Sequence, residues 1–381
     1  MLVSLGSSLP VYVLAAMSVE IDRSLAFGAS ALGLTAGTYY FGAAASSIPL
    51  SRLAERVGGA RVMRVGSAAM GVLLVLIAAF ARSWSVLTVL LGLAGVASGA
   101  VMPASYLFIA RRVPERSQGR AFGLNQAAVP LAALLGGLAV PSVALTIGWR
   151  WAFALAGALA VVASAVVPRS RTSLAERRRA RQGRSVGPVR SLPLVTLSVS
   201  MGLGMFAVSG FLAFLALGAV HDGFTRSDAG YLVAAVGGVA VVMRVAVGFG
   251  ADRRGGGYFP LVAAMMTAGG VGYLLVSAAS AESVRWLFAA AAIAAVGAGW
   301  GWNALFNLGV VRAHLQAPAK ATGFTDVGGR IGGMLGPVAA GQILDRTHYD
   351  LAWLVLAVAA FVAATAAVIG YRQLAATSEG R

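Results

Sequence analysis

Long apolar stretches alternate with short polar segments along the whole chain. Crossing the hydrocarbon core of a bilayer takes about 20 helical residues, and nearly every stretch reaches that length. Lipid offers no partners to backbone N–H and C=O groups, so each stretch is predicted to be a helix. Twelve transmembrane helices are therefore predicted, which makes this an all-α membrane protein. The predicted spans are residues 2–19, 30–50, 62–81, 86–110, 121–141, 150–167, 193–218, 228–250, 258–278, 284–311, 322–343 and 351–371.

Basic residues gather in alternate loops. With both termini in the cytoplasm, 22 of the 30 Lys and Arg residues fall in cytoplasmic segments and six in external segments, while Arg244 and Arg330 lie within spans. This bias follows the positive-inside rule. Tryptophans favour membrane interfaces, and five of the seven lie near the external one: Trp84, Trp149, Trp151, Trp286 and Trp353. We expect a multi-pass protein of the cell inner membrane with both termini cytoplasmic.

Composition excludes several classes of protein. In a soluble protein with 59% hydrophobic residues, 11% charged residues would be too few to cover the surface. The net charge of +17 is explained by cytoplasmic loops, so no nucleic-acid partner is predicted. The chain has no cysteine, and its three histidines fall in separate loops, so neither a metal site nor a cofactor is predicted. No basic region precedes residues 2–19, so a cleavable signal peptide is not expected either.

The chain divides into two related halves. An arginine-rich segment, 168–192, is predicted to be a cytoplasmic linker between a six-helix bundle at 1–167 and another at 193–381. At an offset of 200 residues, Gly123 aligns with Gly323 and Gly136 with Gly336. Duplicated halves of this kind suit alternating access to a site near the midplane of the membrane.

Two loops carry a family resemblance. LSRLAERVGGARVMR, residues 50–64, resembles the loop between the second and third helices of the major facilitator superfamily, and GFGADRRGG, residues 248–256, resembles its second copy. The resemblance implies the fold of that superfamily and a loop that pins neighbouring helices in one state of transport. The gating residues it implies are Glu55, Arg56, Arg61, Asp252 and Arg253. Arg244, two turns before Asp252, is predicted to be a gate contact at the cytoplasmic end, with substrate binding as the alternative. The alternative is that these are basic turns that only set the topology.

Two spans differ from those of the superfamily's proton-coupled drug exporters. The fourth span, LLGLAGVASGA from Leu90, lacks the arginine that proton-coupled drug exporters of the superfamily carry there. The fifth span, with AVPLAALLGG ending at Gly137, has only part of their glycine–proline element. Drug export is therefore an alternative that the sequence does not favour.

Charges inside spans mark candidate transport residues, because each costs about 2.5–3.5 kcal/mol or more at mid-bilayer. Asp326 and Arg330 are spaced i, i+4, which places them on one helical face. We expect Arg330 to bind an anionic or polar group of the substrate and Asp326 to take up a proton. A self-neutralising pair packed between helices is the alternative.

Amides and aromatic rings at similar depth could line the substrate site with Arg330. The predicted set is Asn125, Gln126, Trp300, Trp302, Asn303, Phe306 and Asn307. Hydrogen bonding between helices is the alternative for each amide. The span tyrosines Tyr12, Tyr39, Tyr40 and Tyr106 are weaker candidates, because a lone tyrosine in a span more often serves packing.

These features predict a secondary transporter for a small organic solute, working as a monomer in the bilayer and not as an enzyme, with proton coupling left open. No nucleotide-binding GxxxxGK[ST] motif occurs in the sequence. A proton-coupled exporter of drugs or metabolites is one alternative, and a non-transporting membrane sensor or scaffold is another.

Overall fold

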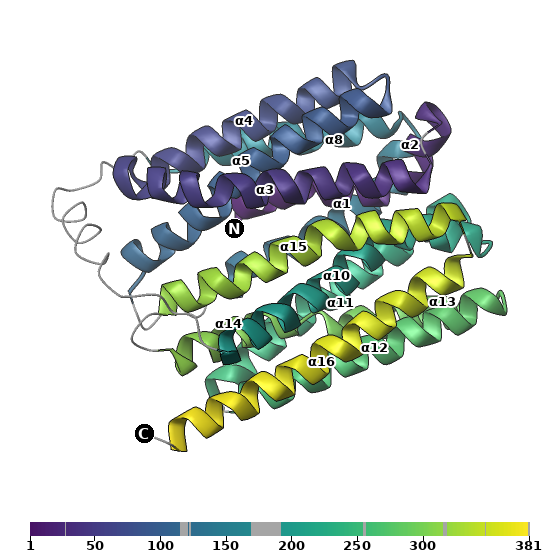
Figure 1. The fold of residues 1–381 in the computed structure, drawn as a ribbon. Helices are drawn as coiled ribbons and strands as arrows, with labels where there is room; N and C mark the ends of the chain where they lie inside the picture. Colours follow the sequence, from purple (N-terminus) through teal and green to yellow (C-terminus); the bar gives the residue numbers. More distant parts are fainter. Residues whose placement is uncertain are drawn as a thin grey trace.

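The computed structural model describes residues 1–26, 28–114, 121, 123–168, 192–253, 257–314, 318–346 and 348–379. These residues form helices and connecting turns, without β-strands. The helices before the linker lie together as one layer of the molecule, and those after it form the other (Figure 1). Most of the predicted linker, 168–192, and the basic residues Arg116, Arg120 and Arg254 lie outside the described residues.

The first half contains seven α-helices and one π-helical turn within its described residues. They are α1 (Leu2–Ala16), α2 (Ser18–Leu25), α3 (Ala29–Val57), α4 (Gly59–Phe80), α5 (Trp84–Arg112), α7 (Ala128–Ala139), η1 (Val140–Ala144) and α8 (Trp149–Val166).

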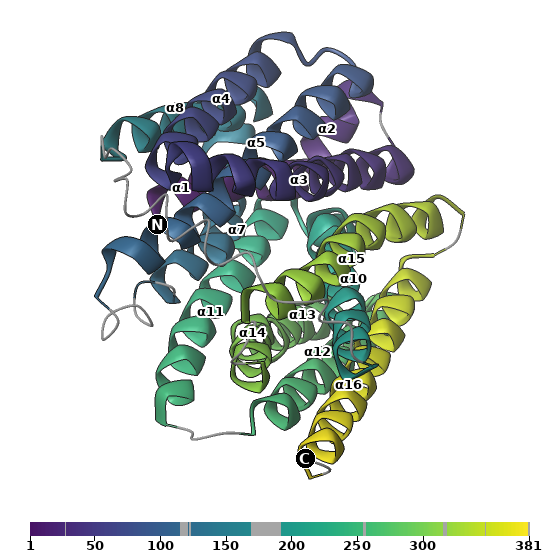
Figure 2. The same ribbon diagram turned by 60° about the vertical axis from the view of Figure 1, so that its left-hand side comes forward.

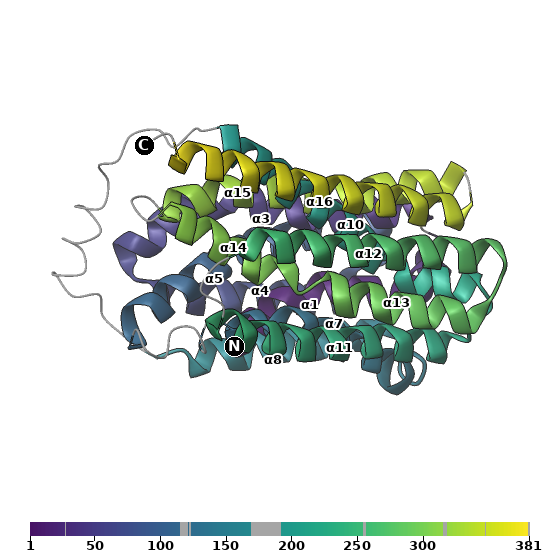
Figure 3. The ribbon, with the colours of Figure 1, turned by 90° about the horizontal axis from the view of Figure 1, so that it is seen from below.

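The second half contains seven α-helices within its described residues. They are α10 (Leu192–His221), α11 (Arg226–Arg253), α12 (Tyr258–Ala281), α13 (Arg285–Gly299), α14 (Trp302–Ala313), α15 (Pro318–Arg346) and α16 (Tyr349–Glu379). Seen from the side of this half, they run lengthwise beside one another (Figure 3).

Ten of the twelve predicted spans meet the length and hydropathy expected of a membrane helix. Nine do so in the described residues as continuous or nearly continuous helices, and the bent pair α1–α2 makes the tenth. The remaining two, α3 and α15, have 29 residues each but contain more polar, charged and glycine residues. For these two, membrane crossing stays a prediction.

Three spans depart from the straight helices predicted for them. The first bends by 63° between α1 and α2. The fifth passes into η1, where Pro141 has no N–H with which to continue the α-helical bonding. The tenth breaks at Trp300 and Gly301, between α13 and α14. Gly299 and Gly301, on either side of Trp300, are poor helix formers and explain why an apolar run predicted as one helix is interrupted.

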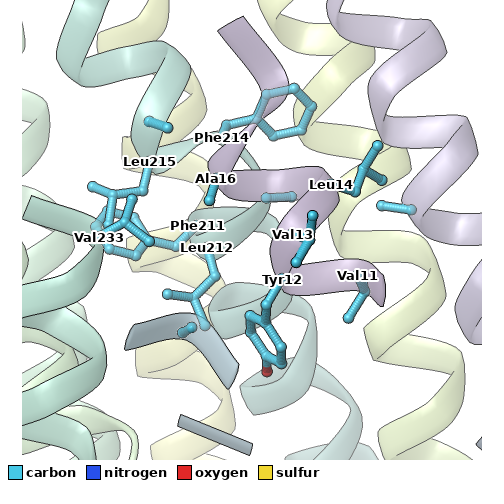
Figure 4. Packing of buried hydrophobic residues seen from close by; sticks show 14 of the residues in the cluster. Val11, Tyr12, Val13, Leu14, Ala16, Phe211, Leu212, Phe214, Leu215 and Val233 are labelled. Carbon is cyan, nitrogen blue, oxygen red and sulfur yellow. The ribbon is translucent and has the colours of Figure 1, made fainter. Parts of the chain in front are cut away.

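The halves meet along three helix pairs. Helix α1 packs against α10, α3 against α15, and α7 against α11, and the α7–α11 contact lies between the two layers in Figure 2. Residues 11–16 of α1 approach α10 side chains from Phe211 to Leu215 and Val233 of α11 (Figure 4). Glycines allow close approach in the other two pairs, since Gly33 lies against the backbone of Pro337 and Gly137 against that of Ala234.

Candidate functional site

Arg244 projects from α11 into the contact between the halves. Its side chain is buried, and its guanidinium carbon lies 4.9 Å from the ring centroid of Trp300. Its Nη1 donates a hydrogen bond of 2.8 Å to the backbone carbonyl oxygen of Gln126, in the first half. The break after α13 positions Trp300 as the C-cap of that helix. Arg244 therefore connects the tenth span to the fifth.

Three tyrosines of the first half lie together, and one of them, Tyr12, adjoins Trp300. The ring of Tyr12 on α1 lies 6.1 Å from that of Trp300, and its hydroxyl is hydrogen-bonded to Tyr40 on α3. The rings of Tyr39 and Tyr40 lie 5.6 Å apart, nearly perpendicular. The Tyr39 hydroxyl donates to the backbone carbonyl oxygen of Ser7. These bonds fix the tyrosines to each other and to α1.

Arg330 approaches the same tyrosines from α15. Its Nη1 donates a hydrogen bond of 3.2 Å to the backbone carbonyl oxygen of Ala43 on α3. The guanidinium is also within electrostatic range of Tyr39. One turn further along α15, Gly333 leaves room for the ring of Tyr40. Like Arg244, Arg330 therefore bonds to a neutral carbonyl group of the opposite half.

These six residues form what we call the arginine–tyrosine cluster. The second half supplies two arginines and an indole, which are Arg244, Arg330 and Trp300. The first half supplies three phenol groups, which are Tyr12, Tyr39 and Tyr40. Guanidinium groups present paired N–H donors that match carboxylate oxygens, and phenol hydroxyls can bond to the same oxygens or to hydroxyl groups. The arrangement can bind a small anion between the halves.

Asp326 lies one turn before Arg330, half-buried, as the i, i+4 spacing predicts. Its carboxylate is within electrostatic range of Arg330. However, neither of the two ion pairs found among the described residues involves Asp326 or Arg330. The Asp326 carboxylate also makes no hydrogen bond within the described part of the chain. Asp326 and Arg330 are therefore near each other but do not form an ion pair in the described structure. This leaves the carboxylate available to another partner.

The two predicted amides of the tenth span bond to each other. Asn307 donates from Nδ2 to Oδ1 of Asn303 at 3.3 Å, and Asn303 faces the sulfur atoms of Met201 and Met205 at 3.9 and 3.7 Å. The Oδ1 atom of Asn307 is buried without a hydrogen-bond partner in the described structure. This oxygen could accept a bond from a ligand or a water molecule.

Other predicted site residues lie in packed surroundings. Trp302 and Phe306 are 1% and 0% exposed and belong to a hydrophobic core of the second half, with Phe306 perpendicular to Phe259. Asn125 is buried between Ser4 and Ser105, bonding to the former at 2.6 Å and the latter at 3.3 Å. The structure does not bring these three side chains into the arginine–tyrosine cluster, and their packing alone accounts for them.

The predicted gating residues are only partly described. Arg56 and Arg61 are exposed on either side of Gly58, whose φ of 100° requires the conformational freedom of glycine. The side chains of Glu55, Asp252 and Arg253, together with that of Tyr106, lie outside the described residues. The latch at these loops stays a prediction. Arg244, predicted as a gate contact, instead lies buried in the cluster described above.

Some features of the interface had little or no signal in the sequence. The tyrosines matched the ordinary pattern of packing residues, and only the folded chain shows that α1 and α3 bring them to one place. Likewise, Asp345 at the end of α15 bonds to the backbone of Ala29 and Ser30 on α3, and Glu20 pairs with Arg226. Both contacts involve charges that the sequence placed in loops.

Comparisons with known proteins agree with this architecture. The family model described as Major Facilitator Superfamily matches residues 1–325. Two proteins of Agrobacterium vitis, each named "Putative tartrate transporter", are 25% and 24% identical to the chain over 365 and 364 residues. Both alignments cover 87% of this chain, and they cover 79% and 82% of the relatives.

A relative that matches part of the chain and a solved structure extend these matches. "Probable anion transporter 6, chloroplastic" of Arabidopsis thaliana is 26% identical over 143 residues, which cover 38% of this chain and 28% of that protein. The crystal structure of a bacterial homologue of the human lysosomal transporter Spinster, inward-facing and occupied, has a TM-score of 0.74 at 15% identity. The match covers 97% of this chain and 95% of that chain, which shows a common fold.

Proposed function

Because this chain belongs to the major facilitator superfamily, and is thus a membrane transporter and not an enzyme, we propose that it transports a small organic anion by alternating access. One observation supports this substrate class more than any other. Two arginines inside membrane helices, Arg244 and Arg330, each donate a hydrogen bond to a backbone carbonyl of the opposite half.

A carbonyl oxygen is a weaker acceptor than a carboxylate. A carboxylate brings the opposite charge and can accept two parallel N–H bonds from one guanidinium, whereas a backbone carbonyl is neutral. A guanidinium in the membrane costs several kcal/mol of free energy, and a hydrogen bond to a neutral carbonyl does not neutralise its charge. An anion that enters between the halves would replace the carbonyl and compensate the charge. The arginines thus favour an anionic substrate over a neutral one.

Substrate binding in this arrangement is linked to movement. The bonds from Arg244 to Gln126 and from Arg330 to Ala43 join the two halves in the structure described. When a carboxylate takes their place, these two links between the halves are broken. Binding would therefore lower the cost of rocking one half against the other, which is what alternating access requires.

The names of the relatives point to the same class. The two Agrobacterium vitis proteins are named for tartrate, and the Arabidopsis protein is named for anions. Tartrate carries two carboxylates and two hydroxyls. The cluster has two guanidinium groups and the hydroxyls of Tyr12 and Tyr40. A hydroxylated dicarboxylate is the first substrate to test.

Counterflow in proteoliposomes tests the proposal directly. Purified protein would be reconstituted into vesicles loaded with unlabelled tartrate, succinate, acetate or glucose, and uptake of radiolabelled tartrate would be followed. We expect uptake with dicarboxylate inside and little with glucose. Arg244→Gln and Arg330→Gln should each reduce the signal, while Arg312→Gln, an exposed arginine on α14, should not.

Other results would favour the alternatives. Failure of every organic anion in this assay, together with exchange of a lipophilic cation, would favour the drug exporter. Binding of tartrate without any flux would favour a sensor.

Proton coupling is a separate part of the proposal. We propose that Asp326 takes up the proton, because it is the acid nearest the arginine–tyrosine cluster along α15 and makes no bond in the described structure. Protonation would remove its attraction for Arg330 and free that guanidinium for the substrate.

The monomeric state and the cytoplasmic location of both termini also belong to the proposal.

A further inference from the structure

The N-terminus of α3 has no capping side chain of its own. Its N-cap is Gly28, and no side chain of the same half bonds to its first turn in the described structure. The first N–H groups of a helix have no partner within that helix and need one elsewhere. Asp345, near the end of α15 in the other half, supplies it. The amide of Ala29 donates to Oδ1 at 3.0 Å and that of Ser30 to Oδ2 at 2.9 Å.

Asp345 is poorly placed with respect to its own helix. It lies in the last turn of α15, which ends at Arg346. The C-terminal end of a helix carries partial negative charge, so an acid there is unfavourable, whereas an acid at an N-terminus is favourable. The carboxylate is therefore stabilised by α3 only while the ends of the two helices stay together. This makes the contact specific to one conformation of the transporter.

The surrounding contacts belong to the same end of the molecule. Ser30 Oγ donates to the backbone carbonyl oxygen of Gly341 at 3.4 Å, and Gly37 packs against Val338 further along the two helices. Figure 1 shows α3 and α15 side by side, with these ends next to α2.

A second bond between the halves lies at this end. Glu20 on α2 pairs with Arg226, the first residue of α11, at 2.9 Å. In the predicted topology this is the external end. The two charged contacts thus hold the same end closed.

We propose that Asp345 is a gating residue, a latch whose carboxylate holds this end of the transporter closed until α15 releases α3. The inference rests on the proposed alternating access, because a latch matters only if this end opens. A bidentate cap with two charge-assisted bonds, and not packing alone, sets the balance between closed and open states.

The absence of cysteine from the chain provides a clean test. Val338→Cys would be the single thiol, placed on α15 where Val338 packs against Gly37 of α3. Its rate of modification by a bulky hydrophilic maleimide would be measured in nanodiscs, which expose both membrane faces and require no substrate. Asp345→Asn in this background removes the charge of the cap.

Two further variants complete the design. Ala29→Pro removes one of the two N–H donors but keeps the helix, because proline is favoured at the first helical position. It therefore tests the same contact from the side of α3, in case Asp345→Asn does not fold. Asp228→Asn is the matched control, since Asp228 lies at the same end but bonds to Thr225 within its own half.

We expect Asp345→Asn to raise the modification rate by about five- to thirtyfold, the range given by the stabilisation usual for helix caps and charges at helix ends. Ala29→Pro should raise it less, and Asp228→Asn should leave it unchanged. Unchanged rates in both Asp345→Asn and Ala29→Pro, or an equal rise in Asp228→Asn, would overturn the latch. A rise without any anion transport by the parent protein would support the latch and refute the proposed substrate instead.

Discussion

Arg244 and Arg330 show how a charged side chain can be held inside a membrane protein by backbone carbonyl groups. Each guanidinium bonds to a carbonyl of the opposite half, and Arg244 also lies over the face of Trp300. A cation over an indole face is stabilised by roughly 0.5–2 kcal/mol. Such contacts hold the arginines in position but compensate their charge only in part, which is the condition that favours anion binding.

Removing the charge of Arg330 should weaken anion binding. In Arg330→Gln the side chain keeps a neutral N–H donor but loses the positive charge that attracts a carboxylate. Hydrogen bonds to charged groups contribute about 1.5–3 kcal/mol, so we expect the Kd for tartrate to rise about 10- to 100-fold. Isothermal titration calorimetry of the purified protein measures this. Arg312→Gln is the control, and an unchanged Kd in Arg330→Gln would remove Arg330 from the site.

Asp326→Asn should separate coupling from exchange. The amide has the same shape as the carboxylic acid but cannot take up or release a proton. We therefore expect loss of tartrate accumulation driven by an imposed pH gradient, with counterflow exchange retained. Both are measured in the same proteoliposomes. Accumulation at the wild-type level would show that Asp326 does not carry the proton.

The residues of the cluster differ in how far the sequence could predict them. Arg244, Asp326 and Arg330 were identifiable because charge is costly in a membrane span. The role of Tyr12, Tyr39 and Tyr40 could not be predicted, because tyrosine is compatible with lipid interfaces, packing and binding alike. Trp302 and Phe306 were selected for their depth along the tenth span, but depth does not reveal which face of the helix meets the core.

At the scale of helices, glycine determines how closely neighbours approach. Gly332 on α15 has no room for a Cβ, which would meet the carbonyl oxygen of Gly202 on α10. Gly323, about two and a half turns earlier on the same helix, has nothing within 4 Å of that position. Periodicity in the sequence predicted both spans, but it could not distinguish a glycine needed for packing from one that is not.

This contrast gives a paired prediction. Gly332→Ala should force α15 away from α10 and lower the Tm of the purified protein by several degrees, because overpacking costs about 1–3 kcal/mol. Gly323→Ala should leave the Tm unchanged or raise it slightly, since alanine is the better helix former. Thermal unfolding followed by intrinsic tryptophan fluorescence measures both. Equal effects of the two variants would contradict the packing argument.

The break in the tenth span could not be predicted from the sequence either, because it too depends on glycine packing. The tenth span has the apolar composition of one continuous helix, yet it ends at Gly299 and resumes at Trp302. Gly299 lies against Gly269 on α12, so close packing and weak helix propensity act together at this point. The break brings Trp300 to Arg244, and so an irregularity in one element helps to build the candidate site.

At the scale of the whole molecule, the repeat in the sequence has a counterpart in space. Gly136, in the fifth span, lies against the backbone of Tyr12 in the first span. Gly336, its partner at an offset of 200, lies against the backbone of Phe206 in the seventh span. The fifth and eleventh spans thus use matching glycines to pack on matching helices, which supports a duplication. The superfamily and the all-α membrane fold predicted from the loops are confirmed by the comparisons.

The orientation in the membrane can be tested with the same cysteine-free chain. The bias of basic residues predicts that the loop after α12 is external and the 168–192 segment cytoplasmic. Ser283, exposed in that loop, and Ser185, in that segment, are suitable positions for single cysteines. In intact spheroplasts a membrane-impermeant maleimide should modify Ser283→Cys at once and Ser185→Cys only after the membrane is permeabilised.

The reverse pattern would place the termini outside and would move the Asp345 contact to the cytoplasmic end. Equal modification of both cysteines in intact cells would show a leaky preparation or a mixed orientation, which a periplasmic and a cytoplasmic marker protein distinguish. The arginine–tyrosine cluster would keep its geometry under either orientation, because it lies between the halves. Only the direction from which an anion first reaches it would change, since the contacts at Asp345 and Glu20 close one end and not the other.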